Sequence, residues 1–433
     1  MSLSLPSKVY VTVYYDDTAN YFYQLEGDLE QHKIQLIYLC HNLSAFLFLK
    51  FRSFHQVVYI NNISHRLTWL YYMIRPRHFS NELPPYVDKL IVNSKLKRRW
   101  TSELLAKKKF IKSLNTENAG VILSGEDRLL EWLLRKECSH RVYFEQGPFN
   151  TTTISHSGVN ANLRSSVQLH QFFLKEKFSD EMYFQRRNRV QRSPGYRIID
   201  FINYFLTRCF LIGLPSEDAD WSTLGRKISS KLPIHSFNSA AIESADQNVK
   251  VLLVLQVFTD VNNLIYTPLY NIEKILRMLL SKKKASSDIQ VIIRPHPLDS
   301  RERLKEISLF QKKYGFNISR RSLHEDLKWA DVVLTSNSTV GIEAYLIGLP
   351  VVAFGKSYWE GLSEVKIVSE YSEILNKVQL AFSNKSTISK EARVKEVSYF
   401  LRSHFVPGHF RFKIVSNKLV SQWILHELEQ RQS

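Results

Sequence analysis

The sequence predicts an α/β protein made of two domains, each built around a parallel sheet. The 433 residues are enough for two domains of ordinary size. In both halves of the chain, short apolar runs alternate with helical stretches, and this spacing is typical of βαβ units. Between the halves lies a polar stretch, residues 216–247, which lacks hydrophobic periodicity and is predicted to be a linker.

Short apolar runs mark the predicted strands. In the first half they are Val9 to Tyr14, Gln35 to Tyr38, Val57 to Ile60, Leu90 to Val92, Val121 to Leu123 and Val142 to Phe144. In the second half they are Val249 to Val257, Ile289 to Ile293, Val332 to Leu334 and Val351 to Phe354. Their length and their content of β-branched residues favour buried strands of parallel sheets.

Helices are predicted between and after these strands. Thr267 and Pro268 are interpreted as the N-cap and first residue of a helix that ends at Lys282 to Lys284. The predicted organisation is an N-terminal α/β domain at 1–215, the linker at 216–247, a C-terminal α/β domain at 248–385 and a helical segment at 386–433. Two Rossmann-like domains with a cleft between them and a terminal helical segment describe the GT-B architecture.

Composition excludes several classes of protein. A hydrophobic content of 44% is too high for a disordered chain. The three cysteines are far apart and odd in number, so they form neither a disulfide framework nor a zinc spacing and favour a reducing compartment. The N-terminus lacks a signal-peptide pattern, and the longest apolar runs fall short of the ~20 residues that a membrane helix needs. A soluble or peripheral protein is expected.

The net charge of +18 favours an acidic partner or surface. Residues 95–112 hold eight basic side chains against one acidic side chain. Leu96, Trp100, Leu104 and Leu105 fall at helical spacing, so this segment is predicted to be a basic amphipathic helix on anionic lipid. A solvated helix face remains open. Nucleic acid is not expected, because no nucleic-acid-binding motif surrounds the segment.

The segment 331–355 carries the most informative pattern. A buried strand ends at Leu334, a turn with hydroxyls and backbone N–H groups follows, and then a helix begins. A helix N-terminus has partial positive charge and unpaired donors, which suits a phosphate. Glu343, one turn into the helix, is predicted to accept hydrogen bonds from a ribose. The turn residues predicted to bind the nucleotide are Ser336, Asn337, Ser338 and Thr339.

Three further polar clusters follow predicted strands at their carboxyl ends, where open α/β sheets bind ligands. Glu145 precedes a Gly-Pro turn, and a capping or solvated carboxylate is the alternative interpretation. Asp260 follows the first strand of the second domain, where an Asx turn is the alternative. His296 stands between two prolines in Arg294-Pro-His-Pro297, which fix its backbone so that the imidazole can meet a phosphate at one set position. A lone histidine is more often structural.

No metal site is predicted. The sequence has no cysteine pair, no His-x-x-x-His on a helix and no Asp-x-Asp near a strand end. It also lacks a Walker phosphate loop and the Rossmann Gly-x-Gly-x-x-Gly. The missing Asp-x-Asp weighs against the other large glycosyltransferase architecture, which commonly holds its sugar nucleotide through a divalent metal.

These motifs resemble those of the bacterial capsule polysaccharide synthesis family, which includes the retaining β-Kdo transferases (Kdo is 3-deoxy-D-manno-octulosonic acid). The segment from Val254 to Asp260, with Asn262 and Pro268, resembles the family's "PLQ…D" element. The segments that look like its Glu-x-Gly, Gly-Val-Asn-Ala and His-Pro elements are Glu145-Gln-Gly147, Gly158-Val-Asn-Ala161 and Arg294-Pro-His-Pro297. The Ser/Thr turn with Glu343 matches its CMP-binding helix. The resemblance spans about residues 140–355.

The resemblance implies an enzyme that moves Kdo from CMP-β-Kdo to a glycan acceptor with retention. It implies Asp260 as the nucleophile, Glu145 as the general base, and His296 as the group that binds or protonates the departing phosphate. Arg294 and Pro297 join the turn in binding the nucleotide. The residues implied to bind substrate are Gln146, Gly147, Asn160, Gln256 and Asn262. The first domain is then the acceptor side, the second binds the nucleotide, and no cofactor or metal is needed.

An anionic donor, a lipid-linked acceptor and a basic protein together favour a peripheral position at the cytoplasmic face of the membrane. Three alternatives remain open: an inverting sialyltransferase that uses CMP-sialic acid, a CDP-polyol phosphotransferase, and a polyanion-binding protein without catalysis. The sequence does not specify the acceptor sugar, the linkage, or whether the product is a capsule, an O-antigen or a lipopolysaccharide core.

Overall fold

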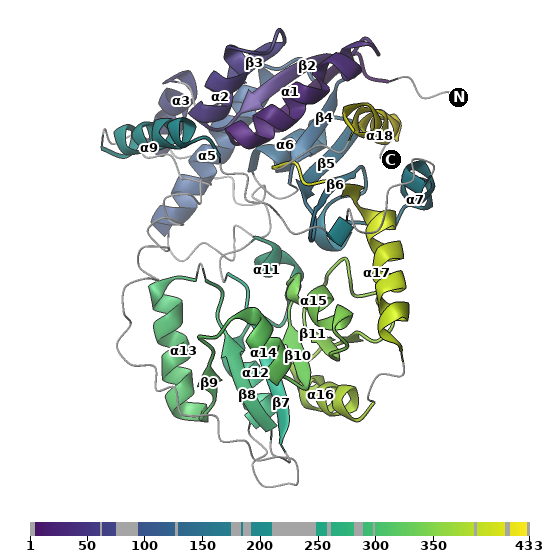
Figure 1. Cartoon of the computed structure of the whole chain (residues 1–433). Helices are drawn as coiled ribbons and strands as arrows, with labels where there is room; N and C mark the ends of the chain where they lie inside the picture. The colour runs from purple at the N-terminus through teal and green to yellow at the C-terminus, as the bar shows by residue number, and fades with distance from the viewer. Residues whose placement is uncertain are drawn as a thin grey trace. The chain divides into compact units, whose positions relative to one another are not determined.

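The chain divides into two compact units, one formed by Met1–Glu217 with Leu401–Ser433 and the other by Asp218–Phe400 (Figure 1). The computed structural model describes residues 5–60, 63–74, 94–125, 129–174, 183–184, 192–209, 248–257, 261–280, 289–297, 299–384, 388–411 and 416–430. The predicted linker, 216–247, and the predicted strand at Leu90 to Val92 lie outside these residues.

The first unit is built on a seven-stranded sheet in the order β13-β6-β5-β4-β1-β2-β3. Its strands are β1 (Lys8–Val13), β2 (Gln35–Cys40), β3 (Gln56–Tyr59), β4 (Gly120–Ser124), β5 (His140–Gln146), β6 (Thr151–Ser155) and β13 (Val406–Pro407). The strands from β3 to β5 in this order run parallel, whereas β6 pairs antiparallel with β5 and with β13. The predicted strands of this half that fall within the described residues are confirmed.

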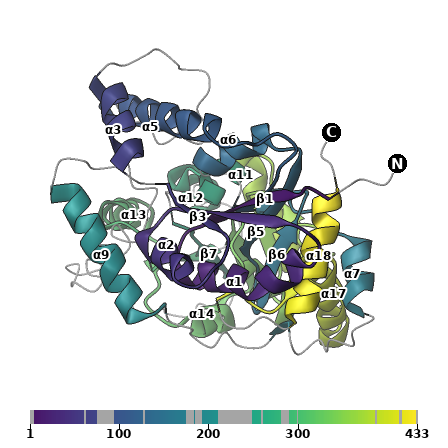
Figure 2. The ribbon, with the colours of Figure 1, turned by 90° about the horizontal axis from the view of Figure 1, so that it is seen from above.

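Helices cover both faces of this sheet. On one face lie α1 (Asp16–Glu30), α2 (Leu43–Lys50), α9 (Pro194–Cys209) and α18 (Asn417–Glu429), and on the other lie α3 (Ile63–Ile74), α5 (Ser94–Lys112) and α6 (Leu129–Glu137). Figure 2 shows α18 beside α1, and α3 beside α5. Alternate residues of β1, Val9, Val11 and Val13, are buried with Phe22 of α1 and Trp423 of α18. The C-terminal helix therefore completes the core of the first unit.

The basic segment forms the helix α5, but its basic side chains do not all face solvent. Leu104 is fully buried, and Lys107 is buried as well and pairs with the buried Glu103 at 3.4 Å. Lys109 and Lys112 are exposed. The apolar side of α5 thus packs inside the first unit, and only part of the predicted basic face is available to a partner.

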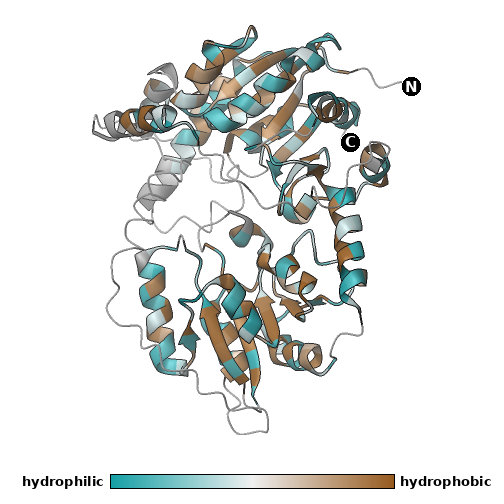
Figure 3. Cartoon of the chain, in the orientation of Figure 1, coloured by the Kyte–Doolittle hydropathy of each residue, from teal (hydrophilic) through white to brown (hydrophobic). Residues whose placement is uncertain are grey.

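The second unit is built on a six-stranded sheet in the order β12-β11-β10-β7-β8-β9, and every pair in it is parallel. Its strands are β7 (Val249–Val254), β8 (Ile289–Arg294), β9 (Asn317–Ile318), β10 (Val332–Thr335), β11 (Val351–Ala353) and β12 (Lys366–Ile367). The four predicted strands of this half are confirmed. The ribbon of these strands is largely brown in Figure 3, the colour of hydrophobic residues, as expected for strands that helices cover on both faces.

The helices of the second unit are α11 (Val261–Tyr266), α12 (Ile272–Leu280), α13 (Arg301–Tyr314), α14 (Leu323–Trp329), α15 (Val340–Leu346), α16 (Ile374–Ser383) and α17 (Lys390–His404). Apolar faces of α12 and α16 pack on the sheet: Ile275 and Leu276 of α12 and Ile374 of α16 share one core with Leu253 and Ile293. These helices therefore pack on one face of the sheet, and the loops described below follow the strands at their carboxyl ends.

The predicted start of one helix is wrong. The helix α12 begins at Ile272, and the Asn271 side chain accepts a hydrogen bond from the Lys274 N–H at 3.0 Å. Asparagine is preferred to threonine as an N-cap residue. Thr267 is fully buried and lies next to Gly355, just after β11. An ideal Cβ on Gly355 would lie 2.7 Å from Thr267 Oγ1.

Two α/β units and a C-terminal helical segment form the GT-B-like fold that the sequence predicts. The segment after residue 385 contains α17, which runs across the boundary at Phe400, and α18, which belongs to the first unit. Among the described helices, none has the length and apolar character needed to cross a membrane.

Candidate functional site

The carboxyl ends of three neighbouring strands in the second unit bring most of the predicted donor-site residues to one edge. In the sheet, Thr335 of β10 pairs with Val254 of β7, which pairs with Arg294 of β8. The Thr335 hydroxyl also donates to the Val254 carbonyl at 3.1 Å. Because the three strands are parallel and end in register, the residues that follow them share this edge, where α/β sheets bind ligands.

The predicted phosphate turn follows β10. Ser336 is buried and donates through Oγ to Oε1 of Gln256, which follows β7, at 3.3 Å. Ser338 Oγ accepts a hydrogen bond from the Val340 N–H at 3.3 Å, so one donor at the start of α15 is already used. Thr339 is the exposed N-cap residue of α15. The turn thus links two strand ends through the Ser336–Gln256 contact.

The helix α15 is held in place by contacts of Gly341 and Tyr345. Gly341, its second residue, packs so closely on Trp359 that an ideal Cβ would lie 2.4 Å from the indole ring. Tyr345 donates a hydrogen bond to the Glu396 carboxylate, and burial together with this acceptor raises the pKa of Tyr345 to about 12, which keeps the donor protonated. Glu343, the predicted ribose ligand, lies half-buried between these two anchored residues.

His296 is fixed by a residue that sequence analysis missed. The buried Asp299 accepts a hydrogen bond from the His296 N–H at 3.3 Å, and the Asp299 N–H donates to the His296 carbonyl at 3.0 Å. Pro295 and Pro297 flank the histidine as predicted, and Pro297 is exposed. Asp299 follows Pro297 by two residues, so a search for an Asx turn after the second proline was the available signal.

The Arg294 side chain contacts Asp326 of α14 and the backbone of Arg321. Its Nη1 donates to Asp326 at 2.6 Å and to the Arg321 carbonyl at 2.8 Å. Asp326 is fully buried and also accepts from Ser319 at 2.6 Å and from Arg321 at 3.2 Å. Because a buried carboxylate needs such partners, Arg294 anchors α14 to β8, a role that the sequence did not predict.

A small pocket lies at the ends of β7 and β10. The residues that line it are Leu255, Gln256, Asn263, Tyr270, Ile272, Ile275, Arg303, Ser336 and Phe354. Its volume is about 20 Å³, enough for one water molecule but not for a nucleotide. Arg303, near the start of α13, also lines this pocket, and its guanidinium group pairs with the Glu306 carboxylate. Sequence analysis missed it, because no motif in the sequence links residue 303 to the turn.

Asp260, the predicted nucleophile, lies outside the described residues, and so does the side chain of Asn262. The chain on both sides of this gap is described. Gln256 contacts the phosphate turn on one side. On the other side α11 is held to the end of β11, because the Lys356 N–H donates to the Tyr266 carbonyl at 2.7 Å.

Glu145 lies in the first unit, near the carboxyl end of β5 and one residue beyond the last pairing of β5 with β4. Its carboxylate lies next to Gly125, whose ideal Cβ would be 3.6 Å from Oε2 and whose φ is +88°. Glu145 is half-buried and pairs in the sheet with Thr153 of β6. Glu145 therefore lies at the end of a strand, as predicted. At this position β5 still pairs with β6 but no longer with β4.

The other predicted residues of the first unit differ in their exposure. Gln146 is exposed, and Asn160 is half-buried at the start of η1 (Asn160–Asn162) with φ +51°. Gly147 is buried, and an ideal Cβ there would lie 2.2 Å from Thr151 Oγ1 and 2.7 Å from the Phe405 ring. The requirement for glycine at 147 is thus explained by packing of the β5–β6 turn.

Among the residues that the structure describes, no group of three or more His, Cys, Asp or Glu side chains is arranged to hold a metal ion. Together with the carboxylates of Asp299 and Glu343, the edge of the second sheet carries hydroxyl, amide, imidazole and guanidinium groups. These groups bind phosphate by hydrogen bonds and positive charge.

Residues 150–370, just over half of the chain, match the model of a family described as capsule polysaccharide biosynthesis protein. The matched range includes the phosphate turn, His296 and Gln256, and it begins five residues after Glu145. No curated protein matches the sequence.

Solved structures give only distant likenesses. A β-Kdo 2,7 transferase, KpsC of Thermosulfurimonas dismutans, is 14% identical over 75% of this chain and 88% of its own, with a TM-score of 0.37. A glycosyltransferase of Rickettsia africae is 10% identical over 97% of both chains, with a TM-score of 0.38. A β-Kdo 2,4 transferase, also KpsC of Thermosulfurimonas dismutans, is 14% identical over 61% of this chain and 78% of its own, with a TM-score of 0.31. Likenesses at this level carry no argument about the chemistry.

Proposed function

The chain belongs to the capsule polysaccharide biosynthesis protein family, and from this premise we propose that it is a glycosyltransferase that moves Kdo from CMP-β-Kdo to a glycan acceptor with retention of configuration. The observation that carries the proposal is the common edge of β7, β8 and β10, where Gln256, His296 and Ser336 follow three adjacent parallel strands. All three residues fall within the range that matches the family.

The donor's CMP group binds at this edge. The hydroxyls and N–H groups from Ser336 to Thr339 hold the phosphate at the N-terminus of α15, together with Asn337, and Glu343 accepts from the ribose. His296, whose backbone Asp299 fixes, binds the phosphate oxygen that leaves and protonates it. Arg303, which pairs with Glu306, lines the same pocket as Ser336 and Gln256.

Retention follows from two displacements. In the first, Asp260 attacks the anomeric carbon of Kdo, the bond to the CMP phosphate oxygen breaks, and CMP leaves with the electron pair. In the second, the acceptor hydroxyl attacks the same carbon, Glu145 takes the hydroxyl proton, and the Asp260 carboxylate departs. Each displacement inverts the configuration, so the β configuration is kept. Gln146, Gly147, Asn160 and Asn262 belong to the substrate-binding segments of this scheme.

The acceptor side of the proposal places the protein at the cytoplasmic face of a membrane, as a peripheral protein. Ile198, Phe201 and Ile202, one helical turn apart on α9, are 58%, 44% and 49% exposed. An apolar stripe of this kind enters a lipid interface when basic groups accompany it. The exposed Lys109 and Lys112 of α5 lie on the other face of the sheet from α9, so the net charge of +18 supplies the attraction to anionic lipid.

The test is CMP release from a panel of CMP-sugar and CDP-polyol donors by the protein with a bacterial glycolipid acceptor fraction. CMP-Kdo, generated in the reaction, is expected to be the donor that is consumed, and His296→Ala is expected to lower donor use most. Release from CMP-sialic acid alone would identify an inverting sialyltransferase, and release from CDP-glycerol or CDP-ribitol with phosphate in the product would identify a polyol-phosphate transferase. Salt-sensitive polyanion binding without CMP affinity would contradict every enzymatic version.

A further inference from the structure

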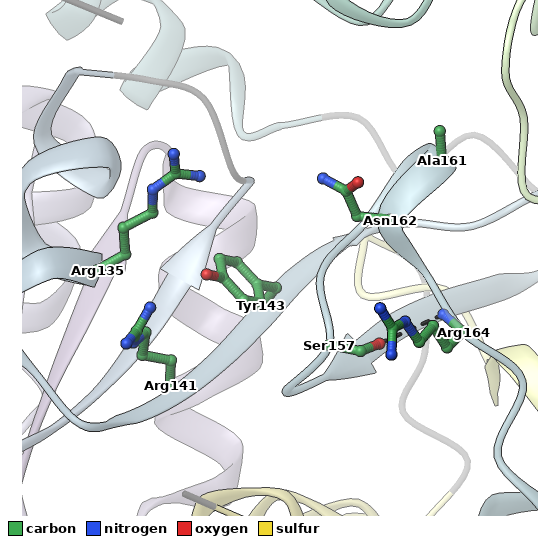
Figure 4. A pocket seen from close by; sticks show the side chains of 7 residues that line it. All are labelled: Arg135, Arg141, Tyr143, Ser157, Ala161, Asn162 and Arg164. Carbon is green, nitrogen blue, oxygen red and sulfur yellow. Dashed lines mark hydrogen bonds between the residues drawn. The ribbon is translucent and has the colours of Figure 1, made fainter. Parts of the chain in front are cut away.

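A basic pocket lies within the first unit. It has a volume of about 380 Å³ and is lined by Arg135, Arg141, Tyr143, Ser157, Ala161, Asn162 and Arg164. Figure 4 shows Arg135 and Arg141 projecting from one side of the pocket and Arg164 from the other, with the Tyr143 hydroxyl pointing toward the first two. A volume of this size falls in the range of about 300–1,000 Å³ that is typical of ligand sites.

None of the described acidic side chains pairs with the three arginines of the pocket. Among the described residues, no Asp or Glu carboxylate lies within 4.0 Å of Arg135, Arg141 or Arg164, and no carboxylate lines the pocket. Elsewhere in the chain, half-buried or buried arginines do pair with carboxylates, as Arg294 does with Asp326 at 2.6 Å. Three like charges around one cavity repel one another, and an anion in the cavity would relieve that repulsion.

Two of the guanidinium groups are oriented by contacts that leave their charge uncompensated. Arg141 Nε donates to the Cys138 carbonyl at 2.9 Å. Arg135 lies over the Trp132 ring, with its Cζ 3.9 Å from the ring centroid. On the opposite side, the Arg164 N–H donates to Ser157 Oγ at 3.3 Å, which fixes the backbone from which Arg164 projects. Two of the three arginines are thus oriented before a ligand arrives, which lowers the cost of binding one.

The pocket shares a strand face with Glu145. Val142 and Phe144 of β5 lie in the core beneath α1 and α18. Because side chains alternate along a strand, Arg141, Tyr143 and Glu145 lie on the opposite face in one row, with successive Cα atoms of the row about 7 Å apart. A molecule bound at Glu145 can therefore extend along β5 into the pocket.

We propose that this pocket binds the negatively charged group of an acidic saccharide, a carboxylate or a phosphate carried on a sugar ring. The arginines bind the oxyanion by charge-assisted hydrogen bonds, and Ser157, Asn162 and Tyr143 supply polar groups for the ring hydroxyls. The assignment of this saccharide as the glycosyl acceptor rests on the proposed function. The anion site itself rests only on the pocket.

The experiment is calorimetric titration of the full-length protein at about 150 mM salt, where weak surface attraction is screened. Glucuronic acid and glucose 6-phosphate present a carboxylate and a phosphate on the same ring, glucose is the neutral match, and inorganic phosphate is the bare anion. The acidic sugars are expected to bind, and the tighter of the two identifies the anionic group. Arg141→Gln and Arg164→Gln are each expected to weaken this binding about tenfold, because each removes a charge-assisted contact. Arg197→Gln, an exposed arginine of α9 in the same unit, is the matched control and should change nothing.

The proposal is overturned if the two pocket variants bind the acidic sugars as tightly as the unchanged protein. It is overturned as well if glucose or inorganic phosphate binds as tightly as the acidic sugars, since the pocket then recognises no sugar-borne charge. Arg164 is exposed, so Arg164→Gln tests the pocket without disturbing the fold. Donor turnover in the same proteins separates the two proposals. If Arg141→Gln and Arg164→Gln weaken sugar binding but the protein turns over no CMP-sugar, the anion site is supported and the assignment of the saccharide as glycosyl acceptor is refuted.

Discussion

Replacing Gly341 with alanine is expected to destabilise the second unit and to displace the phosphate turn. An ideal Cβ at this position would lie 2.4, 2.5 and 2.9 Å from three atoms of the Trp359 ring. Carbon atoms in contact sit about 3.5–4.0 Å apart, so the ring or the helix α15 must retreat by about 1 Å. Trp359 is fully buried and has little room to move.

The magnitude follows from two opposing effects. Overpacking a core costs about 1–3 kcal/mol, and alanine in place of glycine in a helix returns at most about 1 kcal/mol. We therefore expect a net loss of about 1–2 kcal/mol, which lowers the melting temperature of a unit of this size by about 2–8 °C. CMP affinity should fall in the same variant, because Ser338 and Thr339 directly precede α15.

Differential scanning calorimetry and CMP titration measure the two effects. Gly27→Ala is the matched control, because Gly27 lies inside α1 and has nothing within 4 Å of its ideal Cβ. That variant should be as stable as the unchanged protein or more so, with CMP affinity unaltered. If Gly341→Ala melts at or above the temperature of Gly27→Ala, the contact with Trp359 does not constrain α15, and the reasoning is refuted.

Three further predictions concern Glu145, Asp299 and Phe201. Glu145→Gln should lower the transfer rate by about 10²–10⁴-fold while CMP affinity stays unchanged; unaltered transfer in steady-state assays would remove Glu145 as the base. Asp299→Ala should reduce donor use by up to about 100-fold by releasing His296, whereas Asp299→Asn, which keeps an acceptor oxygen for the His296 N–H, should retain most of it; equal losses in both would point to the charge rather than the backbone contact. Phe201→Ser should weaken co-sedimentation with anionic vesicles, and Leu309→Ser, at a more exposed apolar residue of α13, should not; identical behaviour of the two would exclude α9 as the membrane contact.

The strands of both sheets were predictable where burial dictates the residue types. Each of β7, β8 and β10 is a short run of branched apolar residues, since helices cover both faces, and that pattern is visible in the sequence. In contrast, β6 reads Thr-Thr-Thr-Ile-Ser, and only its pairing with β5 and β13 makes it a strand. The five residues of β6 do not by themselves indicate which strands they pair with.

The candidate site was predictable to the extent that its residues follow strands directly. Ser336, Gln256 and His296 were found because the carboxyl ends of parallel strands share one edge. The contact of Arg294 with Asp326 spans 32 residues, and the partner of a charge at such a separation cannot be read from spacing. Arg141 and Tyr143 were missed although they share a face of β5 with Glu145, because Val142 to Phe144 was predicted to be a buried strand of a parallel sheet.

The most direct test of the central claim is the mass of the intact protein after incubation with CMP-Kdo in the absence of acceptor. We expect the mass of the protein to increase by one Kdo residue. The increase should be absent in Asp260→Asn, and it should disappear from the unchanged protein when acceptor is supplied. Asp260→Asn should still bind CMP, because the phosphate turn is unchanged. A protein that turns over CMP-Kdo with acceptor but never gains this mass, or an Asp260→Asn variant that keeps full turnover, would contradict the covalent retaining mechanism.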